Sequence, residues 1–177
     1  MKKIKLYIAT SLNGKIAQSD GSVEWLEKIP DSEGVDHGYN EFYDSIDTTI
    51  MGYSTYKQVI DWGIEFPYKG KKNYVLTRKQ DLENTEDVHF VKQNHGAFIR
   101  GLKSQLGKDI WLIGGGQINT LLWNEGLIDE LIVFIMPIVL SGGIELFEGI
   151  PSQEHLKLND TKTYKNGSIM MTYSTNQ

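Results

Sequence analysis

The residues with the clearest chemical implication are three consecutive glycines, Gly114 to Gly116. They follow the apolar run 110–113 and precede apolar residues at helical spacing, which predicts a buried strand, a turn and a helix. Glycines let a ligand approach the backbone, and the first N–H groups of a helix attract an anion, most often a phosphate. The Rossmann fingerprint needs a third glycine where Asn119 stands, so that fold is not indicated. A turn whose glycines serve only packing is the alternative.

Two further strand ends carry residues suited to phosphates. Ser54 and Thr55 stand where a strand gives way to a helix, and the basic pair Arg78-Lys79 follows another predicted strand. Ligands of open α/β sheets bind at the carboxyl ends of strands, so the three places together predict a dinucleotide site. The glycines would approach the pyrophosphate, the hydroxyls another phosphate, and the basic pair a ribose 2′-phosphate. Helix caps without a ligand and a solvated charge pair are the alternatives.

Several other chemistries lack their residues in this sequence. There is no cysteine, no Gly-x-Ser-x-Gly elbow, no Walker loop and no zinc-deaminase signature. The histidines are scattered without metal-ligand spacing, so we expect no metal site and interpret each as a surface residue. These histidines are His37, His89, His95 and His155.

The composition bounds the class of protein. The chain has 177 residues, of which 40% are hydrophobic and 23% charged, which predicts a single globular domain spanning residues 1–177. The net charge of −5 and pI near 5.4 argue against nucleic acid or an anionic membrane surface as a partner. No apolar run approaches the length of a transmembrane helix, and the amino-terminal run is too short for a signal peptide. We therefore expect a cytoplasmic protein.

Strands alternate with helices through most of the chain. The predicted strands are 4–9, 48–51, 73–77, 88–91, 110–113 and 131–140. The predicted helices are 36–45, one with Ser54 as its N-cap, 96–106, and one that begins after Gly116. Residues 15–34 form a long loop, which is typical of a lid, although a plain surface loop is the alternative. Segments 156–164 and 168–173 predict an antiparallel hairpin, so the fold class is α/β with a mixed sheet and helices on both faces.

Five short segments together resemble the dihydrofolate reductase-like family, and within it the reductase domain of bifunctional riboflavin-biosynthesis proteins. The matching segments are IATSLNGKIA at 8–17, MGYSTY at 51–56, YVLTR at 74–78, IGGG at 113–116 and PIVLSGGIELF at 137–147. They occur in the family's order and extend over nearly the whole chain. No single segment is specific, so the resemblance depends on all five in register.

The resemblance implies a three-layer dihydrofolate reductase-like fold, in which a mixed, mostly parallel sheet has helices on both faces and a C-terminal antiparallel hairpin. It also implies NADPH as hydride donor and a homodimer. Loop 15–34 corresponds to the family's active-site lid, which closes to exclude water from hydride transfer. Carried over by position, Ala9 and Ile16 border the nicotinamide; Gly52, Ser54 and Thr55 the phosphates; Leu76, Thr77 and Arg78 the adenosine end; Gly114, Gly115, Gly116, Gln117 and Ile118 the pyrophosphate and nicotinamide ribose; and Asn13 and Trp25 the lid on the substrate side.

Two positions depart from the family pattern or leave a role open. Tyr53 stands where the family usually has arginine, which removes a cation from the 2′-phosphate region. Counting back from Met51-Gly52 places Asp36 at the substrate-binding acid of dihydrofolate reductases. A carboxylate there accepts hydrogen bonds from a pterin or pyrimidine and relays a proton to the ring. The alternative is that Asp36 caps the helix that follows, and this is the role we favour.

These observations predict an NADPH-dependent oxidoreductase that resembles the 5-amino-6-(5-phosphoribosylamino)uracil reductase of riboflavin biosynthesis. Its partner would be a small pyrimidine- or pterin-like substrate. A dihydrofolate or pterin reductase is the alternative enzyme. A non-catalytic nucleotide-binding module and a structural dimerising domain are the alternatives from other classes.

Overall fold

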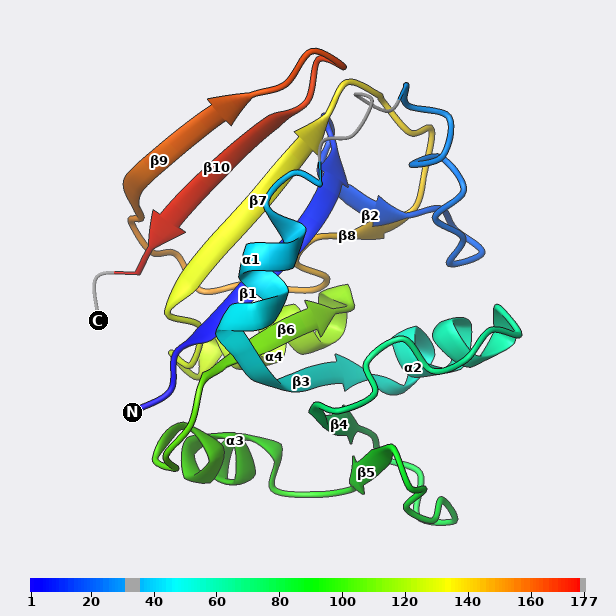
Figure 1. Ribbon diagram of the computed structural model, residues 1–177, viewed down its shortest axis with the longest axis vertical. Helices are drawn as coiled ribbons and strands as arrows, with labels where there is room; N and C mark the ends of the chain where they lie inside the picture. The colour runs from blue at the N-terminus through cyan, green and yellow to red at the C-terminus, as the bar shows by residue number, and fades with distance from the viewer. Residues whose placement is uncertain (31–35, 176–177) are drawn as a thin grey trace.

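The computed structural model describes residues 1–30 and 36–175, and within them an eight-stranded sheet has the strand order β5-β4-β3-β6-β1-β7-β10-β9 (Figure 1). The strands are β1 Ile4–Ser11, β3 Ile46–Gly52, β4 Lys72–Leu76, β5 Val88–Val91, β6 Asp109–Gly114, β7 Glu130–Met136, β9 Lys157–Thr163 and β10 Ile169–Ser174. Neighbours from β5 to β7 are parallel, whereas β10 is antiparallel to both β7 and β9. The prediction of a mixed, mostly parallel sheet with a C-terminal antiparallel hairpin is confirmed.

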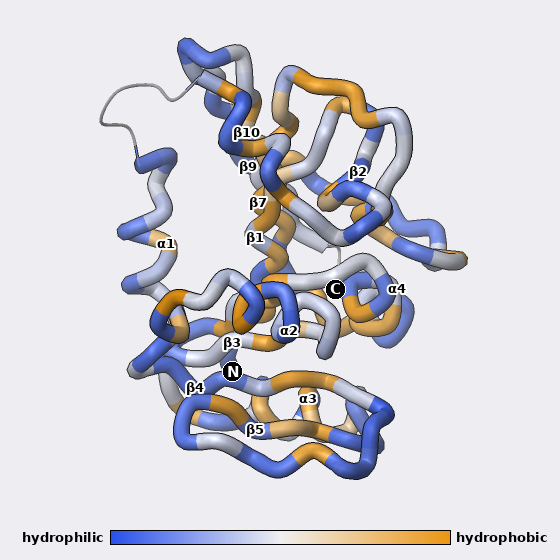
Figure 2. Tube along the Cα trace, turned by 90° about the vertical axis from the view of Figure 1, so that its right-hand side faces the viewer, coloured by the Kyte–Doolittle hydropathy of each residue, from blue (hydrophilic) through white to orange (hydrophobic). Residues whose placement is uncertain are grey.

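The helices cover both faces of this sheet. They are α1 Tyr39–Ser45, α2 Tyr53–Asp61, α3 His95–Lys103 and α4 Gly116–Asn124. One apolar cluster contains residues of α1 and α2, and a second contains residues of α3 and α4. Side chains alternate across a strand, so Trp111 of β6 joins the first cluster while Ile110 and Leu112 join the second. Central strands are therefore apolar on both faces, and the tube in Figure 2 is largely hydrophobic along β7.

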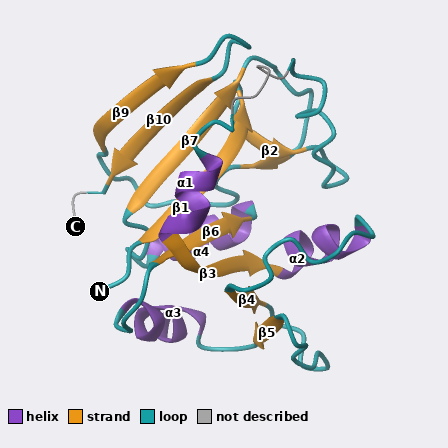
Figure 3. Cartoon of the chain, viewed as in Figure 1, coloured by secondary structure: helices purple, strands orange, loops and turns teal. Residues whose placement is uncertain are grey.

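The region predicted as one long loop contains an additional strand. Residues Lys15–Ala17 form β2, which pairs antiparallel with β8, Ile144–Glu145, in a separate two-stranded sheet. Strands of two and three residues are too short to show a periodic pattern, so they could not be predicted from the sequence. Residues 18–30 contain neither helix nor strand (Figure 3), and the rest of the predicted loop, 31–34, lies outside the described residues.

Some predicted boundaries were wrong for local reasons. The strand predicted to reach residue 140 ends at Met136, because Pro137 has no N–H for the ladder. The helix predicted from residue 36 begins at Tyr39. Ser54 lies inside α2, whose N-cap is Gly52. Among the described residues, no helix is both long enough and apolar enough to cross a lipid bilayer.

Candidate functional site

The starts of α2, α4 and β2 meet where β3 and β6 end. A Cβ atom placed on Gly115 would lie 3.5 Å from Thr55 Oγ1 and 3.9 Å from Ile16 Cδ1. A Cβ atom on Gly52 would lie 2.9 Å from Ile118 Cγ1, so a side chain there would crowd α4. We call this meeting place the glycine junction: Ile16, Gly52, Thr55, Gly114, Gly115, Gly116 and Ile118.

The two helices that begin at the glycine junction have free N-terminal ends. Neither α2 nor α4 has a side-chain hydrogen bond at its N-cap, Gly52 or Gly115. Their first N–H groups therefore remain available, with the positive end of each helix dipole, to an anion. Thr55 adds a half-buried hydroxyl and Ser54 an exposed one. Two uncapped helix starts beside a side-chain-free turn fit the phosphates of a dinucleotide.

The end of β4 supplies the residues predicted for the adenosine end. Leu76 and Thr77 are buried, and the N–H of Thr77 donates to the Val91 carbonyl oxygen at 3.0 Å. Arg78 is exposed, while the Nζ atom of Lys79 lies 4.2 Å from the centre of the Tyr53 ring. A cation over an aromatic face is an attractive contact. Tyr53 thus stands where the family usually has arginine, and the ammonium group of Lys79 lies beside its ring.

The predicted lid residues occupy different places. Trp25 is 2% exposed, and its indole Nε1 has no hydrogen-bond partner among the described residues. The loop that carries it is tied to α2, because the Gln58 side chain donates to the Gly21 carbonyl oxygen at 2.6 Å. Asn13 joins the end of β1 to the chain beyond β7 through two hydrogen bonds with the Leu140 backbone, at 2.8 and 3.1 Å. The side chain of Gln117, at the start of α4, donates to a Glu148 carboxylate oxygen at 3.3 Å.

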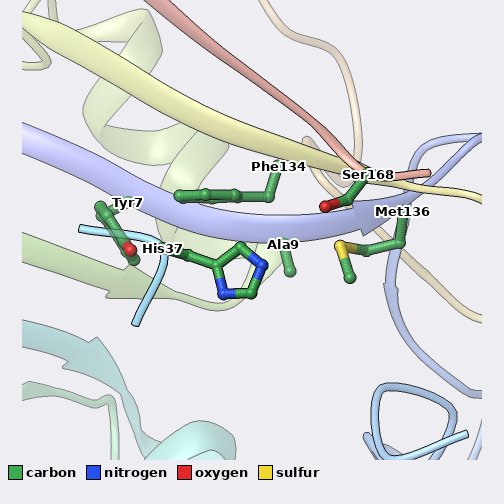
Figure 4. A pocket seen from close by; sticks show the side chains of 6 residues that line it. All are labelled: Tyr7, Ala9, His37, Phe134, Met136 and Ser168. Carbon is green, nitrogen blue, oxygen red and sulfur yellow. The ribbon is translucent and has the colours of Figure 1, made fainter. Parts of the chain in front are cut away.

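A second part of the site is a pocket of about 190 Å³ (Figure 4). It lies between β1, β7, the β9–β10 turn and His37, which precedes α1. We call it the substrate pocket. Its lining is mostly apolar and includes one imidazole, one phenol and one hydroxyl. The lining residues are Tyr7, Ala9, His37, Phe134, Met136 and Ser168. Burial, followed by the neighbouring Tyr164, raises the pKa of Tyr7, so this phenol stays neutral at physiological pH.

His37 stands out within the substrate pocket. Its Nε2 atom is buried and has no hydrogen-bond partner in the described part of the chain. Its ring centre lies 4.4 Å from that of Tyr164 and 6.4 Å from that of Phe134. Its backbone φ of 54° is left-handed, which is uncommon for a residue other than glycine. His37 was interpreted as a surface residue, whereas its ring is half-buried and lines the substrate pocket. Only its place beside Asp36, just before a helix, could have pointed to this.

Asp36 lies outside the lining of the substrate pocket. Its exposed carboxylate accepts hydrogen bonds from the backbone N–H groups of Gly38, at 3.0 Å, and Asn40, at 3.2 Å. These two hydrogen bonds lower the pKa of Asp36. The carboxylate is thus engaged with the backbone at the beginning of α1.

The glycine junction and the substrate pocket adjoin along β1. Ala9 lines the pocket, and the preceding Ile8 places Cδ1 3.6 Å from the position of a Cβ on Gly114. Because successive side chains of a strand point to opposite faces, β1 contacts the pocket through Ala9 and the glycine turn through Ile8. In residues 1–30 and 36–175, no three histidine, aspartate or glutamate side chains are grouped so that they could hold a metal ion.

Comparison with known proteins gives a consistent picture. The family model described as the RibD C-terminal domain matches residues 2–170. The uncharacterized protein YwjB of Bacillus subtilis (strain 168) is 40% identical over 163 residues, which are 92% of each chain. A crystal structure of a Shewanella sp. PV-4 protein named for riboflavin biosynthesis is 28% identical, with a TM-score of 0.87 over 100% of both chains.

The fold also matches that of a known reductase. Dihydrofolate reductase from Enterococcus faecalis, complexed with NADP(H), has a TM-score of 0.71 and 17% identity, covering 99% of this chain and 97% of that one. At this identity the match bears on the fold alone. It confirms the predicted dihydrofolate reductase-like, three-layer α/β architecture.

Proposed function

Because this chain belongs to the RibD C-terminal domain family, a family of riboflavin-biosynthesis-type reductases, we propose that it is an NADPH-dependent reductase of a pyrimidine- or pterin-like substrate. The observation that carries the proposal is the glycine junction, where two helices begin without side-chain caps beside Gly114 to Gly116. This arrangement suits the spaced phosphates of a dinucleotide. When bound, the reduced coenzyme supplies a hydride.

The residues of this chain have three tasks in the proposed reaction. The glycine junction and Thr77 hold the dinucleotide, with Ala9 and Ile16 beside its nicotinamide end. The substrate pocket holds a flat ring among Tyr7, Phe134 and Met136, next to Ala9. The loop with the buried Trp25 lies over α2 and excludes water from the transfer.

We also propose that the coenzyme is NADPH rather than NADH. The support is Lys79, whose ammonium group lies over the Tyr53 ring at the start of α2. It restores a cation to the region from which the Tyr53 substitution removes one. Arg78, exposed on the same turn, is a second cation for a 2′-phosphate. The homodimer and the cytoplasmic location expected from the sequence stay predictions.

The experiment that tests the proposal follows oxidation of NADPH by its near-ultraviolet absorbance. The purified protein is mixed with 5-amino-6-(5-phosphoribosylamino)uracil, with its dephosphorylated form, or with dihydrofolate. Turnover of either pyrimidine supports a riboflavin-pathway reductase, and turnover of dihydrofolate alone would favour the dihydrofolate reductase alternative. Coenzyme binding without turnover of any of them would favour a nucleotide-binding module.

A further inference from the structure

The substrate pocket contains one buried polar atom without a partner in the described chain, the Nε2 of His37. A buried nitrogen that makes no hydrogen bond costs free energy unless something else in the functional state provides one. Figure 4 shows the imidazole of His37 in the middle of the lining side chains, beside Ala9. The atom is therefore placed to meet whatever ring the pocket holds.

Neighbouring groups fix the position of this imidazole. Tyr164, from the β9–β10 turn, packs against it at 4.4 Å between ring centres, and Phe134 lies edge-on at 6.4 Å. On its own segment, Asp36 accepts hydrogen bonds from the backbone N–H groups of Gly38, the N-cap of α1, and of Asn40. A left-handed backbone at His37 persists where its surroundings determine it, and such residues concentrate at functional sites.

The other titratable groups near the ring leave the role of proton donor to His37. Tyr7 faces the pocket from β1, and burial raises its pKa, so its phenol is a poor acid at neutral pH. Tyr164 has its pKa raised in the same direction and by the same cause. Asp36 is the neighbouring carboxylate, and it is exposed and bound to backbone N–H groups.

None of the described lining residues is a carboxylate, and this bears on the substrate. A diaminopyrimidine edge presents several N–H donors and needs an anionic acceptor to bind them. A ring edge with carbonyl oxygens or an imine nitrogen needs a donor instead, and a protonated Nε2 provides one.

We propose that His37 is the hydrogen-bond and proton donor of the substrate pocket, and that the ring held there turns an acceptor edge toward α1. The inference rests on the reductase function proposed above. In the reaction, the carbon of a C=N bond receives hydride from reduced nicotinamide coenzyme, which is oxidised. The π electron pair moves to the nitrogen, where a new N–H bond forms as the imidazolium form of His37 gives up its Nε2 proton and becomes neutral imidazole. Water returns the proton to the imidazole.

Two variants separate hydrogen bonding from proton transfer. His37→Gln keeps an N–H donor near the Nε2 position but cannot act as an acid. His37→Asn tolerates the left-handed backbone, and its shorter side chain cannot reach the same point. His89→Gln, at an exposed position on β5, is the matched control. Binding of uracil and of 2,4-diaminopyrimidine is followed by the NMR shifts of the His37 imidazole and of neighbouring amides.

We expect the wild-type protein and the His89→Gln control to bind uracil at least tenfold more tightly than 2,4-diaminopyrimidine. We expect His37→Asn to lose that preference.

With a turnover substrate, His37→Gln should keep KM within about threefold and lower kcat by about 100-fold or more, the usual range for removing a general acid. Tighter binding of the diaminopyrimidine, or unchanged kcat in both variants, would overturn the inference. NADPH binding is measured on the same samples, because its absence from the wild type would contradict the proposed function instead.

Discussion

The glycine junction and the substrate pocket adjoin along β1 but are built from different parts of the chain. The junction consists mainly of backbone: two helix starts without side-chain caps, and glycines at the ends of β3 and β6. The pocket consists of side chains, brought together from β1, β7, the β9–β10 turn and the segment before α1. Backbone groups suit a chemical group that is common to many ligands, such as a pyrophosphate. Side chains, in contrast, select one particular substrate ring.

Substitutions in the glycine junction and in the substrate pocket should therefore have different effects. At the junction, an added methyl group would crowd a neighbouring side chain or stand in ligand space, so changes there should act on coenzyme affinity. In the pocket, the aromatic side chains around His37 set where one nitrogen lies, so changes there should act on substrate choice and turnover. Four predictions test this division.

The largest effect is expected from Gly115→Ala. Its φ of −85° is open to any residue, and the new Cβ would make ordinary contacts of 3.5 and 3.9 Å, so the fold should tolerate it. The methyl group would nevertheless stand where a pyrophosphate approaches, and we expect NADPH affinity to fall by about 10- to 100-fold, or roughly 1.4–2.8 kcal/mol. Calorimetry measures the loss of NADPH affinity, and thermal melting checks that the fold is retained.

Gly101→Ala in α3 is the matched control for that variant. Nothing lies within 4 Å of its new Cβ, and alanine in a helix is more stable than glycine by roughly 0.5–1 kcal/mol. It should bind NADPH like the wild type. Equal NADPH affinity in Gly115→Ala and Gly101→Ala would show that no ligand approaches the glycine turn.

The next effect is expected from Lys79→Gln. Loss of the ammonium group over Tyr53 should weaken NADPH binding by about tenfold, roughly 1.4 kcal/mol, and leave NADH binding unchanged, because only NADPH carries a 2′-phosphate. Lys72→Gln, exposed at the opposite end of β4, is the control. Equal losses for both coenzymes would assign Lys79 a structural role instead.

A smaller effect is expected at Asp36, in the comparison of Asp36→Asn with Asp36→Ala. The N–H groups of Gly38 and Asn40 bond to different oxygens of Asp36, and asparagine keeps one acceptor oxygen, so one hydrogen bond is retained and kcat should stay within about twofold of the wild type. Alanine removes both bonds and loosens the segment that carries His37, so kcat should fall a few-fold. A loss in Asp36→Asn as large as that in His37→Gln would place the carboxylate in the chemistry.

The smallest effect is a pH dependence of stability from the same residue. Backbone hydrogen bonds lower the pKa of Asp36 below its ordinary value of 3.8, so the ionised form stabilises the folded protein. Above pH 3.8 this contribution is fully present, and it is lost as the pH falls through the lowered pKa. The difference in melting temperature between wild type and Asp36→Ala should therefore shrink in acid. A difference that stays constant with pH would contradict the assignment.

The predictability of each region follows from how local its determinants are. The turn at Gly114 to Gly116 and the α/β alternation depend on neighbouring residues, so the sequence indicated them directly. The pairing of β2 with β8 and the burial of His37 by Tyr164 and Phe134 depend on segments far apart in the chain. Composition around His37 alone could not distinguish a surface imidazole from one inside a pocket. The lysine beside Tyr53 was visible in the sequence, but only the fold brings the two together.

The most direct test of the account is a titration of the purified protein with NADPH and, separately, with NADH, followed by fluorescence of its four tryptophans. We predict saturable micromolar binding with NADPH preferred, because the uncapped helix starts hold the phosphates and Lys79 meets the 2′-phosphate. Equal affinity for the two coenzymes would contradict the role of Lys79 alone. Absence of binding to either coenzyme would contradict the assignment of the glycine junction and, with it, the reductase function.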